Sequence, residues 1–140
     1  MGVGAQVRTL ITGAPRTGKT TMGLFYAEQG IRHFCTDPQD LCPAGVPGTP
    51  VGLGWSECSQ WVADKLLELP GPWVIEGVAV PRALRKWHAA HPDAPPPADR
   101  LIVLTEQHEA LTARQDAMGV GLLAVLAELG DWLAPILVYR

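Results

Sequence analysis

One stretch near the amino end limits what this chain can fold into more than any other. It reads Gly13-Ala14-Pro15-Arg16-Thr17-Gly18-Lys19-Thr20 and lies between a short β-branched run and a segment with helical periodicity. The spacing matches the pattern G-x-x-x-x-G-K-[ST], which joins a strand to a helix and wraps a polyphosphate in backbone amides. The chain is therefore expected to place a strand, a glycine-rich loop and a helix in that order.

Each fixed position of this stretch has a physical task on a polyphosphate. Gly13 and Gly18 let the main chain approach the phosphates without a Cβ atom in the way. Lys19 would bridge the β- and γ-phosphates, and the hydroxyl group of Thr20 would coordinate Mg²⁺. Nine residues are expected to bind the nucleotide: Gly13, Ala14, Pro15, Arg16, Thr17, Gly18, Lys19, Thr20 and Thr21. The alternative is a glycine-rich turn with a solvated lysine.

Length and composition predict one globular domain that spans residues 1–140. Hydrophobic residues make up 47% of the chain and charged residues 18%, and the net charge of -3 gives no overall attraction for nucleic acid. The apolar runs fall short of the roughly 20 residues that a membrane span needs. No secretory signal is evident, and the three cysteines, Cys35, Cys42 and Cys58, follow no C-x-x-C spacing. We therefore expect a cytoplasmic protein with reduced thiols.

Strand-like and helix-like segments alternate along the chain. The expected strands are residues 7–12, 31–36, 73–78, 100–105 and 135–139, and the expected helices are 18–29, 55–69, 81–87, 106–117 and 122–129. In the first helix, Phe25 and Tyr26 are expected to pack on the sheet, and Gly119-Val120-Gly121 is expected to interrupt the last helical region. With right-handed crossovers this order predicts an α/β fold, a three-layer α/β/α sandwich around a five-stranded parallel sheet.

Two carboxylates follow expected strands. Asp37 ends the second strand and Glu76 ends the third. The carboxyl ends of parallel strands face the ligand crevice of an open α/β sheet, so both are candidates for the site. Glu76 would hold Mg²⁺, directly or through a water molecule, or position the attacking oxygen. Equally, Asp37 could start a turn before Pro38, and Glu76 could face water.

Further candidates lie on the expected helices and on one long loop. Arg82 and Arg85 are three residues apart and share a helical face that suits an anionic acceptor, although a solvated face would also account for them. Trp55 and Trp61 could stack on a base, or they could be core residues. Residues 37–54 are rich in proline and glycine, which predicts a long loop, either over the nucleotide or without a ligand role.

Taken together, the glycine loop, the strands that end in Asp37 and in Glu76-Gly77, and the helix that carries Arg82 resemble the small P-loop kinases of the nucleoside and nucleotide kinase type. The resemblance implies the P-loop NTPase fold, ATP or GTP bound with Mg²⁺, and transfer of the γ-phosphoryl group to a small acceptor. It implies catalytic roles for Lys19, Asp37, Glu76 and Arg82.

Kinases of this kind carry two or more arginines in a lid before the last helix. Here only Arg114 lies between Thr105 and Gly130, so Arg114 and Arg16 would share that task. The alternative is an ATPase, or a nucleotide-gated module that binds a protein partner through loop 37–54. A nucleic-acid motor is disfavoured by the acidic charge.

Overall fold

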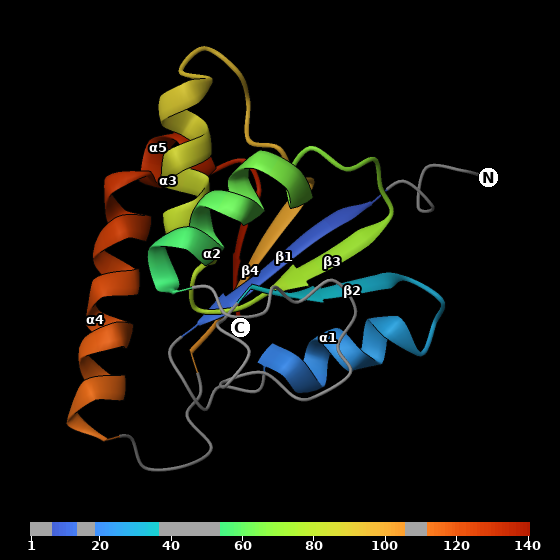
Figure 1. Ribbon diagram of the computed structural model, residues 1–140, viewed down its shortest axis with the longest axis horizontal. Coiled ribbons are helices and arrows are strands. Elements are labelled where there is room, and N and C mark those ends of the chain that lie inside the picture. Colours follow the sequence, from blue (N-terminus) through green and yellow to red (C-terminus); the bar gives the residue numbers. More distant parts are fainter. Residues whose placement is uncertain (1–6, 14–18, 37–53, 106–111) are drawn as a thin grey trace.

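The computed structural model describes residues 7–13, 19–36, 54–105 and 112–140, which form a parallel sheet covered by helices (Figure 1). Within these residues the sheet has five strands in the order β2-β3-β1-β4-β5. The strands are β1 (Arg8–Gly13), β2 (Arg32–Cys35), β3 (Trp73–Glu76), β4 (Arg100–Leu104) and β5 (Leu137–Tyr139). Every pair of neighbouring strands is parallel, which confirms the predicted five-stranded parallel sheet.

Chain order and sheet order together decide which face each helix covers. The helical segments are α1 (Lys19–Ala27), α2 (Trp55–Trp61), η3 (Val62–Leu66), α3 (Val80–Ala90), α4 (Ala113–Glu128) and α5 (Gly130–Leu133). The connection from β1 to β2 crosses the sheet in one direction, and the later connections run in the other. Since such crossovers are right-handed, α1 should cover one face alone. Figure 1 shows α1 on one face and α2, α3 and α4 on the other.

Each strand contributes alternate residues to two cores of unequal size. The larger core lies under α2, α3 and α4 and takes Leu10, Ile75 and Leu101 from the central strands. The smaller core lies under α1 and consists of Ile11, Val74, Ile102 and Leu104, with Met22, Tyr26 and Ile31 packed against it. This alternation along β1, β3 and β4 is the period-2 pattern of strands that are buried on both faces.

The buried face of α1 differs from the predicted one. Tyr26 packs against the smaller core as expected, but Phe25 is 62% exposed. Lys19 and Gly23 are buried and Met22 and Tyr26 are partly buried; these four positions recur at i, i+3, i+4 and i+7 and therefore form one stripe. Phe25 lies outside this stripe, so the expectation that it packs on the sheet was wrong.

The helix expected over residues 55–69 changes geometry part of the way along. α2 gives way to the π-helical segment η3, in which the Leu67 amide donates to the Val62 carbonyl at 3.0 Å. The wider turn leaves both Leu66 and Leu67 buried in the larger core. A helix of uniform pitch, as predicted from the apolar spacing, does not describe this segment.

The predicted interruption at Gly119-Val120-Gly121 is absent from the described residues, because α4 runs through both glycines. Its start is fixed by Thr112, whose Oγ1 accepts from the Gln115 amide at 3.1 Å while Gln115 Oε1 accepts from the Thr112 amide at 3.0 Å. A glycine inside a helix costs about 1 kcal/mol relative to alanine. Burial of Leu122, Val125, Leu126 and Leu129 in the larger core offsets that cost.

The cysteines do not all carry thiols. Cys35, at the end of β2, is disulfide-bonded. This corrects the expectation of three reduced thiols. Cys58 of α2 is a buried thiol. Among the helices of the described ranges, none is long and apolar enough to cross a membrane.

Candidate functional site

The carboxyl ends of β1 and β3 lie side by side at the C-terminal edge of the sheet, where the parallel strands end. The Gly77 amide donates to the Ile11 carbonyl at 3.1 Å, and Thr12 Oγ1 donates to the Gly77 carbonyl at 2.8 Å. Gly13, which follows Thr12, has a φ angle of 156°, and Gly77, which makes both of these contacts, has a φ angle of 150°. Residues with a side chain rarely adopt such angles, so both turns require glycine. The predicted glycine loop and the predicted carboxylate therefore leave the sheet at adjacent points.

Two charged side chains are buried at this edge. Lys19, the first residue of α1, is 8% exposed, and Glu76, the last residue of β3, is 0% exposed. Both make interactions within the protein. Burial of a charge is costly unless partners compensate for it, so these positions are built for electrostatic contacts rather than for solvation. The alternatives of a solvated lysine and a water-facing glutamate do not describe these residues.

A buried hydroxyl group at the same edge was missed by the sequence analysis. Thr36 follows β2, is 0% exposed, and donates its amide to the Glu76 carbonyl at 2.8 Å. Its Oγ1 has no hydrogen-bond partner in the described part of the chain. An unpaired buried hydroxyl costs free energy, which a polar ligand atom could recover. No sequence signal marks Thr36, apart from its position at the end of a strand.

Several predicted site residues cannot be placed. Residues 14–18 of the glycine loop, Asp37 and residues 37–53 of the long loop lie outside the described residues, and so does the side chain of Thr20. Their predicted roles, including that of the loop in binding a protein partner, remain predictions. Thr21 lies in the first turn of α1 and is exposed.

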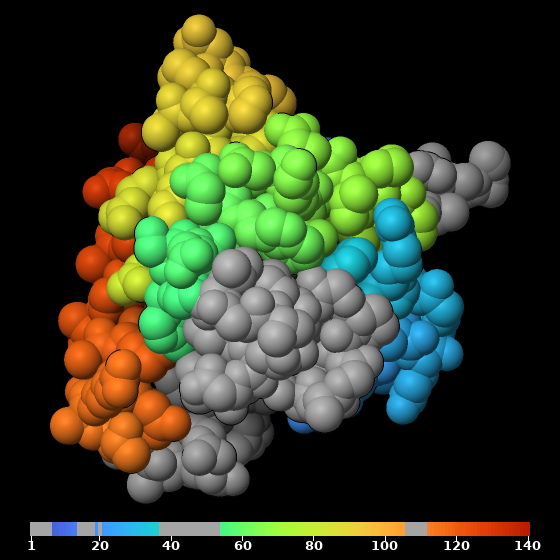
Figure 2. All heavy atoms as spheres, in the orientation of Figure 1, coloured from blue at the N-terminus to red at the C-terminus, as the bar shows by residue number. Residues whose placement is uncertain are grey.

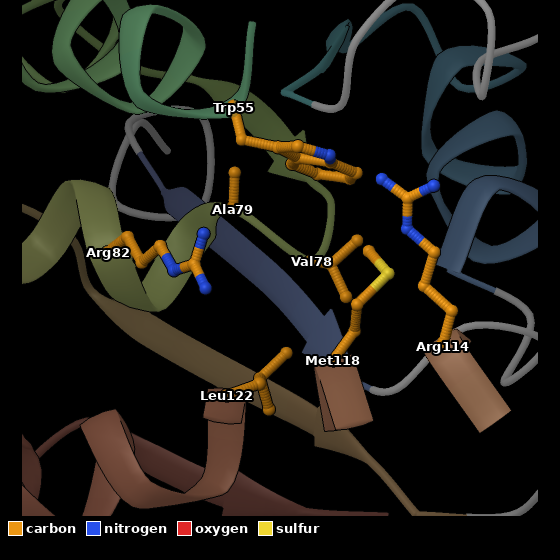
Figure 3. A pocket seen from close by; sticks show the side chains of 7 residues that line it. All are labelled: Trp55, Val78, Ala79, Arg82, Arg114, Met118 and Leu122. Atoms are coloured by element: carbon orange, nitrogen blue, oxygen red, sulfur yellow. The ribbon is translucent and has the colours of Figure 1, made fainter. Parts of the chain in front are cut away.

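A pocket opens beside this edge, between α2, α3 and α4 (Figure 3). Its volume is about 170 Å³, and it is lined by Trp55, Val78, Ala79, Arg82, Arg114, Met118 and Leu122. Val78 is only two residues beyond Glu76, and two residues of extended chain span about 7 Å. The structure thus places Arg82 and Arg114 at one pocket, and Glu76 is two residues along the chain from its lining.

The two arginines of the pocket are available to a ligand. Neither Arg82 nor Arg114 forms an ion pair or hydrogen bond with any described residue. In Figure 3 their guanidinium groups lie on opposite sides of the pocket. Arg85 differs, because it lies 3.9 Å from a carboxylate oxygen of Glu128 and does not line the pocket. Both arginines of the predicted pair are exposed, and Arg82 lines the pocket whereas Arg85 does not.

The two tryptophans of α2 are also divided between roles. Trp55, at the start of the helix, lines the pocket, and Figure 3 shows its indole ring spread across one side of it. Trp61 packs against the larger core instead. Trp61 therefore has the core role, and stacking of Trp55 on a base stays a prediction.

Lys86 holds the start of α2 against α3, which the sequence did not reveal. Its Nζ donates to the Ser56 carbonyl at 2.8 Å, to Ser56 Oγ at 3.2 Å and to Ser59 Oγ at 2.8 Å. Burial lowers the pKa of Lys86, and the positive charges of Arg82 and Arg85 lower it further. Ser56 is next to Trp55, so these hydrogen bonds fix the side of the pocket that the indole ring forms.

The space-filling view places the pocket elements on one side of the molecule. In Figure 2, α3 and α4 (yellow to red) form one flank, and α1 and β2 (blue) form the other.

Comparison of the chain with models of protein families, with curated proteins and with solved structures gives no match. The functional assignment therefore depends on the residues described above.

Proposed function

We propose that this protein binds ATP or GTP at the loop between β1 and α1, and transfers the γ-phosphoryl group to a small acceptor held in the pocket. The observation that carries the proposal is the burial of two charged residues: Glu76 at the end of β3, and Lys19 at the start of the helix that follows the neighbouring strand β1. Beside the C-terminal edge of the sheet lies the pocket with two arginines, neither of which is paired with a described residue. Polyphosphate chemistry needs this combination of a buried ammonium group, a buried carboxylate and nearby guanidinium groups.

The residues at this edge fit Mg²⁺. The ion prefers oxygen ligands, and the motif supplies a threonine hydroxyl while β3 supplies a carboxylate. Thr20 and Glu76 would hold it, Glu76 directly or through a water molecule. When bound, the ion would neutralise charge on the β- and γ-phosphates.

The proposed reaction is a phosphoryl transfer. A hydroxyl oxygen of the acceptor forms a bond to the γ-phosphorus, and the bond from that phosphorus to the β,γ-bridging oxygen breaks. The electron pair leaves with the nucleoside diphosphate, and the hydroxyl proton passes to solvent. The protein contributes placement and charge: Lys19 neutralises the phosphates, Arg82 holds the acceptor, and Arg114 with Arg16 faces the transferred group.

Nucleotide binding is tested by Lys19→Ala, with Lys65→Ala as the matched control. Lys65 is an exposed residue of η3 far along the chain from the motif. Titration with a fluorescent ATP analogue in Mg²⁺ should show binding by the parent and by Lys65→Ala, and a loss of affinity of at least about tenfold in Lys19→Ala. Unchanged binding by Lys19→Ala, or no binding by the parent, contradicts the proposal.

Transfer is tested with γ-labelled ATP and a panel of hydroxylated acceptors. A labelled acceptor supports the kinase. Release of labelled phosphate alone, whichever acceptor is present, would indicate that the protein is an ATPase and not a kinase.

A further inference from the structure

The pocket has room for one ring and little more. A cavity of about 150 Å³ holds a single benzene molecule, whereas pockets for larger ligands measure about 300 to 1,000 Å³. The pocket between α2, α3 and α4 measures about 170 Å³. A nucleoside monophosphate, with a base, a sugar and a phosphate, would extend beyond this space, because the pocket is partly open to solvent. The volume therefore favours an acceptor built on one ring.

The lining of the pocket suits a flat and largely apolar body. Trp55 lies on one side, and Met118 and Leu122 of α4 lie on the opposite side (Figure 3). Indole rings stack on planar groups, and methionine sulfur makes favourable contacts with aromatic rings. Val78 and Ala79 add further apolar surface between them.

The charge of the lining selects an anion. Of the seven described residues that line the pocket, two are arginines and none is acidic. A guanidinium group binds a carboxylate through two parallel hydrogen bonds, and Arg82 has no other ion-pair partner among the described residues. Arg114 lies across the pocket, so it can face the phosphoryl group while Arg82 holds the acceptor.

The size of the pocket is held by bonds between its walls. Lys86 lies four residues after Arg82 on α3, and its three hydrogen bonds to Ser56 and Ser59 fix the start of α2. The wall formed by Trp55 therefore cannot move away from Arg82 without breaking these bonds. A larger acceptor would have to break them.

From these observations we infer that the acceptor is a single-ring hydroxy acid and not a nucleoside or a nucleotide. This inference rests on the proposed function, because it assigns the acceptor of the same transfer. The carboxylate binds Arg82, the ring lies between Trp55 and Met118, and the ring hydroxyl oxygen receives the γ-phosphoryl group in the step given above.

Binding is measured by calorimetry without nucleotide, with 4-hydroxybenzoate, the neutral 4-hydroxybenzyl alcohol and adenosine monophosphate as probes. We expect 4-hydroxybenzoate to bind the parent about tenfold more tightly than either of the others. Arg82→Gln should lose this preference, and Arg85→Gln, which alters an exposed arginine on the same helix, should keep it. Tighter binding of the nucleotide, no binding of 4-hydroxybenzoate, or an unchanged Arg82→Gln variant would overturn the inference.

The same titrations in Lys19→Ala separate this inference from the proposed function. If 4-hydroxybenzoate binds Lys19→Ala and the parent alike but the parent binds no ATP, the proposed transfer fails while the ligand class of the pocket stands. If the parent binds ATP and phosphorylates adenosine monophosphate without binding 4-hydroxybenzoate, the transfer stands and the ligand class is wrong.

Discussion

Gly23 offers a sharp test of how α1 is seated on the sheet. It lies in the middle of α1 and faces the ring of His33 on β2. A Cβ atom at this position would approach His33 Cδ2 to 2.8 Å and Cε1 to 2.9 Å, closer than side-chain atoms normally come. His33 is 2% exposed, so its ring has little room to turn away. Gly23→Ala should therefore force α1 and β2 apart.

The size of the effect follows from two opposing contributions. Overpacking of this kind costs about 1 to 3 kcal/mol, and replacing glycine by alanine inside a helix returns about 1 kcal/mol. We expect a net loss of about 1 kcal/mol, the middle of the resulting range of about 0 to 2 kcal/mol, which for a chain of 140 residues lowers the melting temperature by about 3 °C. Because Lys19 lies one turn before Gly23 on the same stripe, affinity for ATP should fall too.

Gly121 is the matched control for this substitution. It also lies inside a helix, α4, but a Cβ atom there would meet nothing within 4 Å. Gly121→Ala should therefore raise the melting temperature by about 2 to 3 °C, because only the helix propensity changes. Thermal unfolding of both variants, followed by circular dichroism, gives the comparison. A Gly23→Ala protein as stable as the parent, or more stable, would refute this account of the contact.

Two further predictions concern other contacts of the structure. Lys86→Met removes the hydrogen bonds that hold α2 and should weaken binding of 4-hydroxybenzoate several-fold, as measured by calorimetry. Its affinity for ATP should stay at the parent value, and the Lys65→Met control should bind both ligands as the parent does. Equal losses of affinity for both ligands would mean a general loss of structure. Burial lowers the pKa of His33 from 6.5, so the unfolded chain binds its proton more readily and stability should fall as pH drops below 6.5. Urea unfolding at pH 7.5 and 5.5 should show a smaller loss for His33→Met than for the parent, and an equal loss would exclude this residue as the cause.

The sequence best predicted the features that depend on neighbouring residues alone, such as strands and the glycines that follow them. Val7 to Thr12 and Trp73 to Glu76 are short, apolar and β-branched, and both end at glycine, so strands and their carboxyl ends could be predicted. Placing Glu76 next to the glycine loop also required the strand order, which no local pattern contains. That order follows from how the helices pack on the two faces of the sheet.

The errors arose where tertiary contacts overrule local preference. Gly119 and Gly121 predict a break, but core burial of the following leucines keeps α4 continuous. The contacts of Lys86 and Thr36 join segments that are distant in sequence, so the local sequence around either residue does not predict them. The helical spacing of Met22, Phe25, Tyr26 and Gln29 predicts that Phe25 packs on the sheet, whereas the stripe that contains Lys19 and Gly23 sets the orientation of α1.

Residues on the two faces of the sheet have different roles in the proposed reaction. Lys19 is set by α1 and the smaller core, whereas Arg82, Arg114 and Trp55 are set by α2, α3 and α4 on the larger core. Thr12 and Gly77 join β1 to β3 at the C-terminal edge of the sheet, between the two faces. Substitutions under α1 should therefore act mainly on the nucleotide, and substitutions under α3 and α4 mainly on the acceptor. This separation explains why Gly23→Ala and Lys86→Met are expected to weaken the binding of different ligands, although both alter the packing of a helix.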